Sequence, residues 1–269
     1  MDPLSQQVHG PFSREIPTIM YTTEQRREST PAMGLNSPVA VVTGGSGSIG
    51  RAVAELFLGR GMRVVSADRL PTPQNAAPSG NDLQMHYEAD DRKGAQKLVE
   101  ALPAGVAIQH LVLAAGIYPE REFGLISEGE WRECLDINLT AVYRMISAAL
   151  PQLAPDASIV LVSSIAGLRG SKGHAHYAAS KAGLLGLMRS VMWELGGQRR
   201  INTVSPGIIE NRMTQSLREG AGQTILSSTP LGRYGTPMEV AAVIDFLCSP
   251  GASFVHGENI SVNGGFYVN

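Results

Sequence analysis

Cysteine is scarce in this chain, which has 2 in 269 residues. Cys134 and Cys248 lie far apart and lack the spacing of a disulfide framework or a zinc site. We therefore expect no metal centre, and we expect both residues to lie on helices as small apolar side chains. A reducing cytoplasm is the compartment that this cysteine usage favours.

Long apolar runs and an excess of one charge are also absent. No stretch approaches the roughly 20 consecutive apolar residues of a membrane span, and the net charge is −2. A charge so close to zero provides little attraction to nucleic acid or to an anionic membrane. We therefore expect neither as a partner, and a small molecule as the substrate. The apolar content of 43% is sufficient for a substantial core.

Residues 1–36 differ in composition from the rest of the chain. They are polar, they are interrupted by prolines, and they contain no apolar segment typical of a secretory signal. We expect residues 1–36 to form a mobile N-terminal arm and residues 37–269 to form one domain.

Beyond the arm, strand-like and helix-like patterns alternate. Short apolar runs predict strands at 39–43, 62–67, 83–87, 109–114, 158–163, 200–204 and 259–262. Helical patterns separate them at 51–58, 92–102, 130–150, 176–196 and 236–248. This alternation indicates an α/β fold, with a Rossmann-type, doubly wound parallel sheet in a single domain. Ligands of such sheets bind beyond the carboxyl ends of the strands.

A glycine-rich segment follows the first predicted strand directly. It reads Gly44-Gly45-Ser46-Gly47-Ser48-Ile49-Gly50 and leads into the helix at 51–58. Glycines let the backbone turn tightly and approach a pyrophosphate, whose charge is favoured at a helix N-terminus. We therefore predict a dinucleotide site, with contacts from Gly44, Ser46, Ser48, Ile49 and Gly50.

The second predicted strand ends in Asp68, 18 residues past Gly50. A carboxylate there accepts hydrogen bonds from the adenosine ribose and repels a 2′-phosphate, which predicts NAD rather than NADP. Arg69 works against this preference, because arginine suits a phosphate. After the third strand, Asp90 is a candidate contact to the adenine, and a helix N-cap is the alternative for Asp90 or its neighbour Asp91.

Tyr177 and Lys181 are four residues apart, which places them on one face of a helix. The ammonium of Lys181 favours the phenolate, so we expect it to lower the pKa of Tyr177 from the free value near ~10. Such a tyrosine is a usable general acid or base near neutral pH. An ordinary exposed pair is the alternative. Ser164 lies 13 residues ahead of Tyr177 and strengthens the catalytic interpretation.

From about residue 38 to the C-terminus, these segments resemble the short-chain dehydrogenase/reductase family. Thr43–Gly50 is similar to the family's cofactor loop, and Leu113-Ala114-Ala115-Gly116 stands where the family usually has Asn-Asn-Ala-Gly. Further segments similar to the family are Leu135–Thr140, Ser205–Ile209, Pro230–Arg233 and Val262–Gly265.

The resemblance implies a set of site residues. The catalytic residues it implies are Asn138, Ser164, Tyr177 and Lys181, with Ser163 as a rival whose spacing to Tyr177 fits less well. It also implies cofactor contacts from Ala115, Gly116, Tyr177, Lys181, Pro206, Gly207 and Ile209. A homotetramer, or a dimer, is the assembly that the resemblance implies.

A few positions depart from the family pattern. Ser48 stands where the cofactor loop usually carries its second glycine, and Leu113 and Ala114 replace two asparagines. Asn211 stands where a threonine often binds the nicotinamide amide. None of these positions is one of the four catalytic ones.

The resulting prediction is an oxidoreductase that transfers a hydride between NAD(H) and a secondary alcohol or ketone, with Tyr177 as general acid/base. The substrate is expected to be a small or medium polar molecule. Residues 169–176 are expected to line its pocket, and residues 208–229 to act as a lid. His174 and His176 are interpreted as packing or surface residues rather than substrate contacts.

Two other functions compete with this prediction. One is a 3-oxoacyl-acyl-carrier-protein reductase that uses NADPH. Such reductases hold an acidic carrier with basic residues, whereas residues 151–156 contain none and Trp193 stands where arginine is usual. The other is a catalytically silent nucleotide-sensing protein, which has no need to keep the complete catalytic set.

Overall fold

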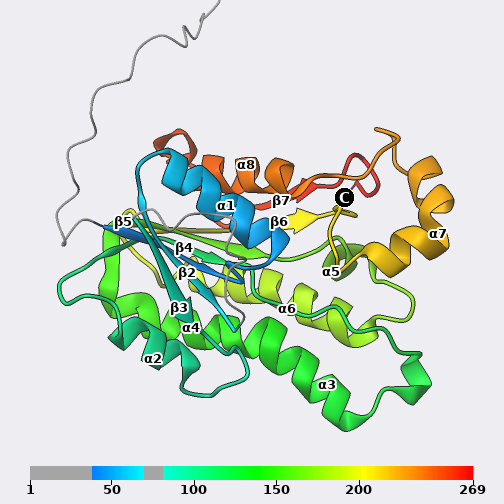
Figure 1. Cartoon of the computed structure of the whole chain (residues 1–269), viewed down its shortest axis with the longest axis horizontal. Coiled ribbons are helices and arrows are strands. Elements are labelled where there is room, and N and C mark those ends of the chain that lie inside the picture. Colours follow the sequence, from blue (N-terminus) through cyan, green and yellow to red (C-terminus); the bar gives the residue numbers. More distant parts are fainter. Residues whose placement is uncertain (1–37, 70–80, 269) are drawn as a thin grey trace, which may run out of the picture. The chain divides into compact units, whose positions relative to one another are not determined.

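A parallel β-sheet runs through the chain, and Figure 1 shows its arrangement. The structure is a computed structural model that describes residues 38–69 and 81–268. Within these residues the sheet has seven strands in the order β3-β2-β1-β4-β5-β6-β7, and every neighbouring pair is parallel. The strands are β1 (Val39–Thr43), β2 (Arg63–Asp68), β3 (Asp82–His86), β4 (Ile108–Leu113), β5 (Leu153–Val162), β6 (Arg200–Pro206) and β7 (Asn259–Val262).

Helices connect the strands and cover both faces of the sheet. In Figure 1, α1 and α8 lie above the sheet, and α2, α3, α4 and α6 lie below it. The α-helices are α1 (Ser48–Gly59), α2 (Gly94–Glu100), α3 (Glu128–Leu135), α4 (Ala141–Ala149), α5 (Ala166–Arg169), α6 (Ala175–Val191), α7 (Gln215–Ser227) and α8 (Pro237–Cys248). The short helices are η1 (Phe123–Leu125), η2 (Asp136–Thr140), η3 (Leu150–Gln152) and η4 (Pro250–Ala252).

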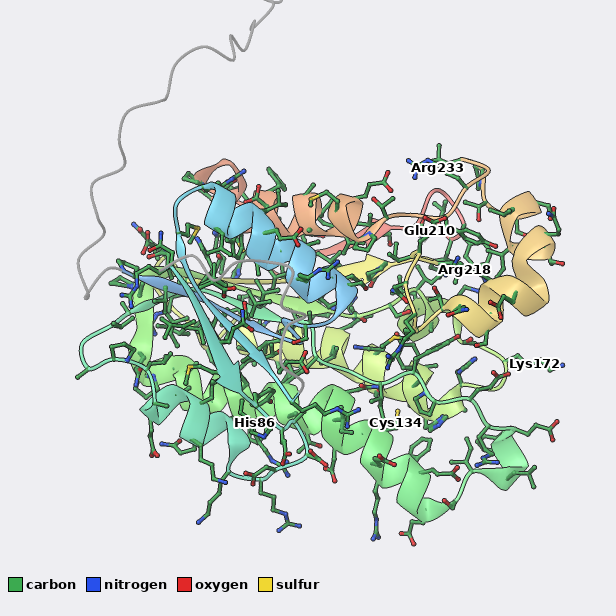
Figure 2. All side chains as sticks on the ribbon, in the orientation of Figure 1. His86, Cys134, Lys172, Glu210, Arg218 and Arg233 are labelled. Atoms are coloured by element: carbon green, nitrogen blue, oxygen red, sulfur yellow. The ribbon has the colours of Figure 1, made fainter. Side chains whose placement is uncertain are left out.

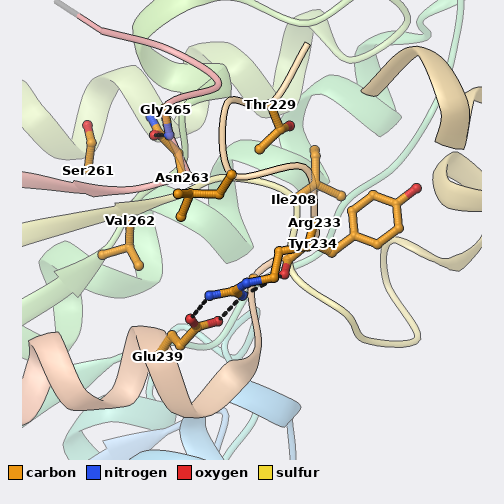
Figure 3. A pocket seen from close by; sticks show the side chains of 12 residues that line it. Ile208, Thr229, Arg233, Tyr234, Glu239, Ser261, Val262, Asn263 and Gly265 are labelled. Carbon is orange, nitrogen blue, oxygen red and sulfur yellow. Dashed lines mark hydrogen bonds and ion pairs between the residues drawn. The ribbon is translucent and has the colours of Figure 1, made fainter. Parts of the chain in front are cut away.

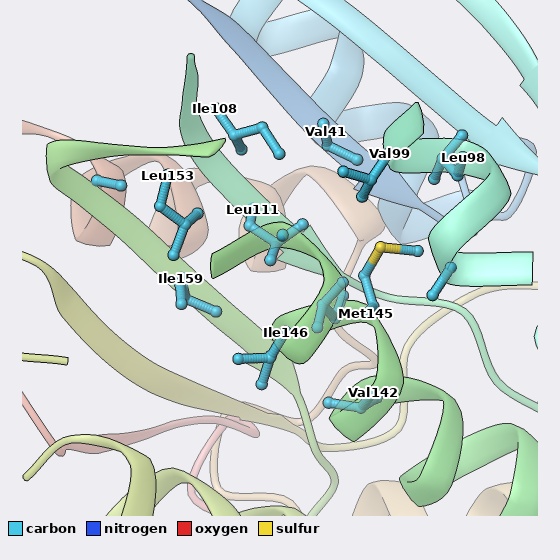
Figure 4. Close-up of a cluster of buried hydrophobic side chains, with 14 of the residues drawn as sticks. Val41, Leu98, Val99, Ile108, Leu111, Val142, Met145, Ile146, Leu153 and Ile159 are labelled. Atoms are coloured by element: carbon cyan, nitrogen blue, oxygen red, sulfur yellow. The ribbon is translucent and has the colours of Figure 1, made fainter. Parts of the chain in front are cut away.

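Alternate residues of β1 enter two separate cores. Val41 belongs to the cluster shown in Figure 4, where β4, β5, α2 and α4 contribute side chains such as Leu111, Ile159 and Met145. Val42 belongs to the second cluster, with Phe57 of α1 and Ile244 and Leu247 of α8 among its members. Because both faces are covered, the central strands are continuously apolar rather than alternating.

Two predicted helices differ from the observed ones. The predicted helix at 130–150 is divided, because the π-helical segment η2 interrupts it between α3 and α4. The predicted helix at 176–196 ends at Val191, shortly before Gly196 and Gly197, which both have positive φ. Positive φ is compatible with glycine but not with helix continuation.

The remaining predictions of organisation divide into tested and untested ones. The single α/β sheet domain is confirmed. The predicted arm at 1–36 lies outside the described residues. No helix among the described residues is long and apolar enough to cross a membrane.

Candidate active site

The glycine-rich loop after β1 is shaped by main-chain contacts. Gly44 has a φ of +71°, and its carbonyl oxygen accepts a hydrogen bond of 2.9 Å from the Gly47 amide. A Cβ on Gly50 would collide with that same carbonyl oxygen, so the start of α1 closes against the loop only with glycine there. This close approach of a helix N-terminus to a glycine turn fits the pyrophosphate of a dinucleotide.

Asp68 lies beside this loop. Its Oδ2 accepts a hydrogen bond of 3.0 Å from the Ser46 amide, so the end of β2 is bound to the glycine-rich segment. Ser48 is the first residue of α1, and the half-buried Ile49 packs against the second core cluster. Arg69 is exposed. The negative charge of Asp68 is therefore placed where the adenosine ribose of a dinucleotide is expected.

The N-cap of α2 is Lys93, so neither Asp90 nor Asp91 caps the helix, and Asp91 instead binds the turn that precedes it. Asp91 Oδ1 accepts a hydrogen bond of 2.9 Å from the Lys93 amide, and Lys97 Nζ lies 2.7 Å from Asp91 Oδ2. The hydrogen bond from Lys97 is the main cause that lowers the pKa of Asp91. Asp90 is exposed, and its predicted contact to the adenine remains a prediction.

The carboxyl end of β4 meets the catalytic residues. The Ala115 amide donates to Thr43 Oγ1 at 3.4 Å, which joins this end to the end of β1. A Cβ on Gly116 would lie 2.9 Å from Asn138 Oδ1 and 3.4 Å from Lys181 Nζ. The segment 115–116 therefore lies between the glycine-rich loop and the side chains of Asn138 and Lys181.

Asn138 is fully buried within the π-helical segment η2. Its Oδ1 accepts from the Ile117 amide at 2.8 Å, and its Nδ2 donates to the Ile117 carbonyl at 3.0 Å and to Ser180 Oγ at 3.2 Å. A π-bulge is a frequent feature of functional sites, because it redirects a side chain out of the helical register. Here it lets one amide hold both the 116–117 turn and α6.

Ser164 and Ser163 face different partners. Ser164 is hydrogen-bonded to the Tyr177 side chain, and its Oγ accepts from the Ala166 amide at 3.1 Å. Ser163 Oγ instead donates to the Lys181 carbonyl at 2.8 Å. The geometry therefore places Ser164, and not Ser163, beside the tyrosine hydroxyl.

The expected lowering of the pKa of Tyr177 is wrong for this geometry. Burial raises the pKa of Tyr177 to about 12, and the hydrogen bond with Ser164 opposes this effect only in part. Lys181 is itself buried, which lowers its pKa to about 8, and its Nζ donates to the Val162 carbonyl at 2.9 Å. That Nζ lies 5.7 Å from the centre of the Tyr177 ring. Desolvation therefore outweighs the attraction between the two groups.

A cavity of about 180 Å³ opens beside Tyr177. Its walls come from α5 and the following loop, the β6 end, α7 and the C-terminal segment. The lining residues are Tyr118, Ser164, Ile165, Ala166, Arg169, Gly170, Ser171, Lys172, Tyr177, Gly207, Ile208, Met213, Thr214, Leu217, Ile225 and Phe266. The predicted loop at 169–176 and the predicted lid at 208–229 both contribute to these walls.

The sequence analysis missed two aromatic residues of this cavity, Tyr118 and Phe266. The Tyr118 ring stacks on His174 with centroids 4.0 Å apart and meets the edge of Tyr177 at 4.7 Å. His174 also contacts the Pro119 carbonyl through Nδ1 at 2.8 Å, and His176 is fully buried. Neither histidine lines the cavity, in agreement with a packing role.

The end of β6 contributes mainly main chain. The Pro206 carbonyl accepts from the Ile165 amide at 3.1 Å, and the Gly207 amide donates to the Val262 carbonyl at 2.9 Å. Ile209 is 2% exposed and packs in the second core cluster, so only its main chain is available to a cofactor. Asn211 Oδ1 accepts from the Thr214 amide at 3.0 Å, which makes it a local turn cap.

A second cavity of about 250 Å³ lies between β7, the C-terminal segment and the loop before α8 (Figure 3). The ion pair between Arg233 and Glu239 forms part of its wall, with an N–O distance of 2.6 Å, and the guanidinium lowers the pKa of Glu239 to about 2. It shares Ile208 with the cavity beside Tyr177. Of the four predicted catalytic residues, Ser164 and Tyr177 line the first cavity, and none lines this one.

Known proteins are similar to this chain in both sequence and fold. The family model described as "Enoyl-(Acyl carrier protein) reductase" matches residues 44–267. Two proteins named 3-oxoacyl-[acyl-carrier-protein] reductase FabG are similar over 88% of this chain and 100% of their own length. The one from Vibrio cholerae is 34% identical over 250 residues, and the one from Thermotoga maritima is 35% identical over 247 residues.

Solved structures extend this likeness. A short-chain dehydrogenase/reductase from Brucella melitensis, named glucose/ribitol dehydrogenase, has a TM-score of 0.82 and 40% identity over 86% of this chain and 97% of its own. The aldohexose dehydrogenase of Thermoplasma acidophilum has a TM-score of 0.78 and 28% identity over 86% of this chain and 94% of its own. On its sheet order, its glycine loop and these matches, this chain belongs to the short-chain dehydrogenase/reductase family of nucleotide-binding oxidoreductases.

Proposed function

We propose that this protein interconverts a secondary alcohol and a ketone of a small polar substrate, with NAD(H) as the cofactor. One observation carries the proposal. Ser164 and Tyr177 line one cavity, with buried Lys181 behind them and Gly116 leading to the glycine loop.

The residues around the loop fit a dinucleotide. The glycines at 44 and 50 leave room where any Cβ would clash, and we propose that Gly44, Ser46, Ser48, Ile49, Gly50 and Asp68 hold its adenosine and pyrophosphate. Arg69, Asp90, Ala115, Gly116, Tyr177, Lys181, Pro206, Gly207 and Ile209 complete the proposed cofactor contacts. When bound, the nicotinamide supplies the hydride chemistry. The Asp68 carboxylate, held at the loop, supports NAD over NADP.

The protein's own groups handle the substrate oxygen and its proton. Ser164 and Tyr177 hold the oxygen, and Tyr177 accepts the hydroxyl proton in oxidation or donates it in reduction. The raised pKa of Tyr177 keeps the phenol protonated at neutral pH, which suits donation. In oxidation the positive charge of Lys181 favours the phenolate. Asn138 positions the 116–117 turn and α6 so that these groups converge.

The cavity supports a polar substrate. Besides Ser164 and Tyr177, three more residues that carry a hydroxyl line the cavity: Tyr118, Ser171 and Thr214. The names of the similar Brucella and Thermoplasma proteins refer to sugars or a sugar alcohol, which are substrates of this kind. We therefore propose a substrate with several polar groups within a few carbons of the reacting alcohol.

A second candidate is a 3-oxoacyl-acyl-carrier-protein reductase that uses NADPH. The names of the curated relatives favour it. Against it, no basic residue stands at 151–156, and Trp193, where such reductases usually place arginine, is 80% exposed. The complete set of Asn138, Ser164, Tyr177 and Lys181 opposes a catalytically silent sensor. We further propose a homotetramer or dimer as the assembly, by the family likeness.

The absorbance of reduced nicotinamide tests the proposal. The full-length protein is assayed in both directions with sugar alcohols, aldoses, cyclic diols, their ketones and an acetoacetyl thioester, each with NAD(H) and NADP(H). We expect turnover of polar alcohols with NAD, reduced about 10²–10⁴-fold in Tyr177→Phe. NADH affinity is expected to stay within about twofold in that variant, because the ring and its packing remain. Wild-type-like turnover by Tyr177→Phe contradicts the proposal, and preferential thioester reduction with NADPH establishes the second candidate.

A further inference from the structure

One wall of the catalytic cavity is positively charged. Arg169 and Lys172 are among the lining residues, and no aspartate or glutamate is. Glu120 lies beside Gly173, where a Cβ would be 3.6 Å from its Oε1, but Glu120 does not line the cavity. A substrate in this cavity therefore meets cations and no opposing carboxylate on the lining surface.

Arg169 is held in place by a ring and not by an acid. Its guanidinium carbon lies 4.8 Å from the centre of the Phe266 ring, in a cation–π contact. Within the described residues, the Arg169 guanidinium has no hydrogen bond or ion pair, whereas the Arg169 amide donates to the Ile165 carbonyl at 2.9 Å. Arg121, Arg132 and Arg233, by contrast, each bind a glutamate at 2.5–2.7 Å. A guanidinium held over a ring face can still donate its N–H groups to a bidentate anion.

Lys172 and Arg169 are both exposed, but only Arg169 contacts an aromatic ring. Figure 2 shows the Lys172 side chain extending away from the body of the molecule. It adds positive potential near the entrance without a fixed geometry. Arg169, which is oriented by Phe266, is therefore the group that can select one end of a substrate.

We propose that Arg169, oriented by Phe266, is an anion subsite of the catalytic cavity, so that the substrate carries a carboxylate or phosphate ester on the same small molecule as the reacting alcohol. The inference rests on the proposed function, and it narrows the substrate class. Because Arg169 lines the same cavity as Ser164 and Tyr177, we expect the anionic group to lie a few carbons from the reacting alcohol.

Pairs of substrates that are similar in structure but differ in charge test the subsite. Two pairs carry a carboxylate: racemic 3-hydroxybutanoate with its methyl ester, and racemic 4-hydroxypentanoate with its methyl ester. The third pair, glycerol 3-phosphate with glycerol, shows whether the subsite accepts a phosphate ester as well as a carboxylate. The variants are Arg169→Gln, Phe266→Leu, and Arg212→Gln as the matched control. Arg212 is an exposed arginine near the cavity that does not line it.

We expect the wild type to favour at least one anionic partner about tenfold or more in kcat/KM. Arg169→Gln should lower kcat/KM for that anion about 10- to 100-fold, mainly through KM, since charge-assisted hydrogen bonds are lost. Its effect on the neutral partner should stay within about twofold. Phe266→Leu should show a weaker effect of the same kind, and Arg212→Gln should behave as the wild type.

A binding measurement separates failure of the subsite from failure of the proposed function. The probe is 3-hydroxy-3-methylbutanoate, a tertiary alcohol that has no hydride to transfer, titrated calorimetrically into the full chain with NADH. Binding that Arg169→Gln weakens tenfold or more supports the subsite even where no pair is turned over. Equal turnover of charged and neutral partners in both proteins overturns the subsite and leaves the proposed function standing. Probe binding that is absent, or equal in Arg169→Gln, with no turnover of any pair overturns the subsite, and the sugar alcohols, aldoses and cyclic diols then decide the proposed function separately.

Discussion

The carboxyl ends of β1 and β5 carry two halves of one site, and the halves are built from different materials. The β1 half is made of main chain, with glycines whose missing Cβ atoms allow α1 to approach the loop. The β5 half is made of buried polar side chains that hydrogen-bond one another and the surrounding main chain. A backbone site fails when atoms are added, whereas a side-chain network fails when atoms are removed. This difference can be tested by substitution in each half.

The largest expected effect is from Asn138→Ala in the side-chain half. The substitution leaves the half-buried amide and carbonyl of Ile117 without their side-chain partner. We expect a loss of about 2–4 kcal/mol in the free energy of unfolding, because each unsatisfied buried group costs about 1–3 kcal/mol. Urea denaturation measures it, with Asn211→Ala as the control. Asn211 has one capping acceptor to lose, so about 0.5–1.5 kcal/mol is expected there. Equal losses in both variants contradict the network.

Adding atoms to the backbone half should produce the next largest effect. The new Cβ of Gly50→Ala would collide with the Gly44 carbonyl oxygen, so the loop or α1 must move. We expect about 1–3 kcal/mol of destabilisation and a weaker affinity for NADH, measured by fluorescence titration. Gly59→Ala is the matched control in the same helix, where the Cβ meets nothing within 4 Å. That control should change stability by less than about 1 kcal/mol. If the two variants bind NADH equally, steric closure of the loop is not what shapes the site.

The smallest expected effect is a change of stability with pH at Lys181. Its folded pKa, about 8, lies below its unfolded value, 10.5, so between these values the unfolded chain binds more protons. Stability contributed by this residue therefore rises with pH and is lowest below pH 8. We expect the wild type to gain about 1 kcal/mol between pH 8 and pH 9 relative to Lys181→Met. Parallel urea titrations of the two proteins measure this difference, and identical pH profiles mean that Lys181 titrates normally.

The fold was accessible from the sequence because its signal is local. Continuous apolar runs such as 39–43 predict strands buried on both faces, and the observed sheet confirms them. The order of strands and helices then leaves few topologies for a parallel sheet. The π-helical segment at Asn138 was not accessible, because its extra residue is selected by contacts with Ile117 and Ser180, which come from other parts of the chain.

The site was accessible in part. The family resemblance pointed to Ser164, Tyr177 and Lys181, and the structure brings them together; their catalytic roles stay proposals. Tyr118 and Phe266 were missed because neither has a neighbour in sequence that marks it as part of a cavity. The predicted direction of the pKa shift of Tyr177 was wrong. The pattern Tyr-x-x-x-Lys shows the positive charge near the phenol, but it does not show that the phenol is buried, and burial raises its pKa.

By itself, the sequence determined the strand and helix order, the glycine turn and the acid at the end of β2, since each depends on residues close along the chain. Only the tertiary structure decided which serine faces Tyr177, that Ile209 turns into the core, and that Arg169 stacks on Phe266 in the cavity wall. These outcomes depend on burial and on contacts between distant segments. Both are properties of the packed chain, because the cost of removing a charge or a hydroxyl from water depends on everything that surrounds it.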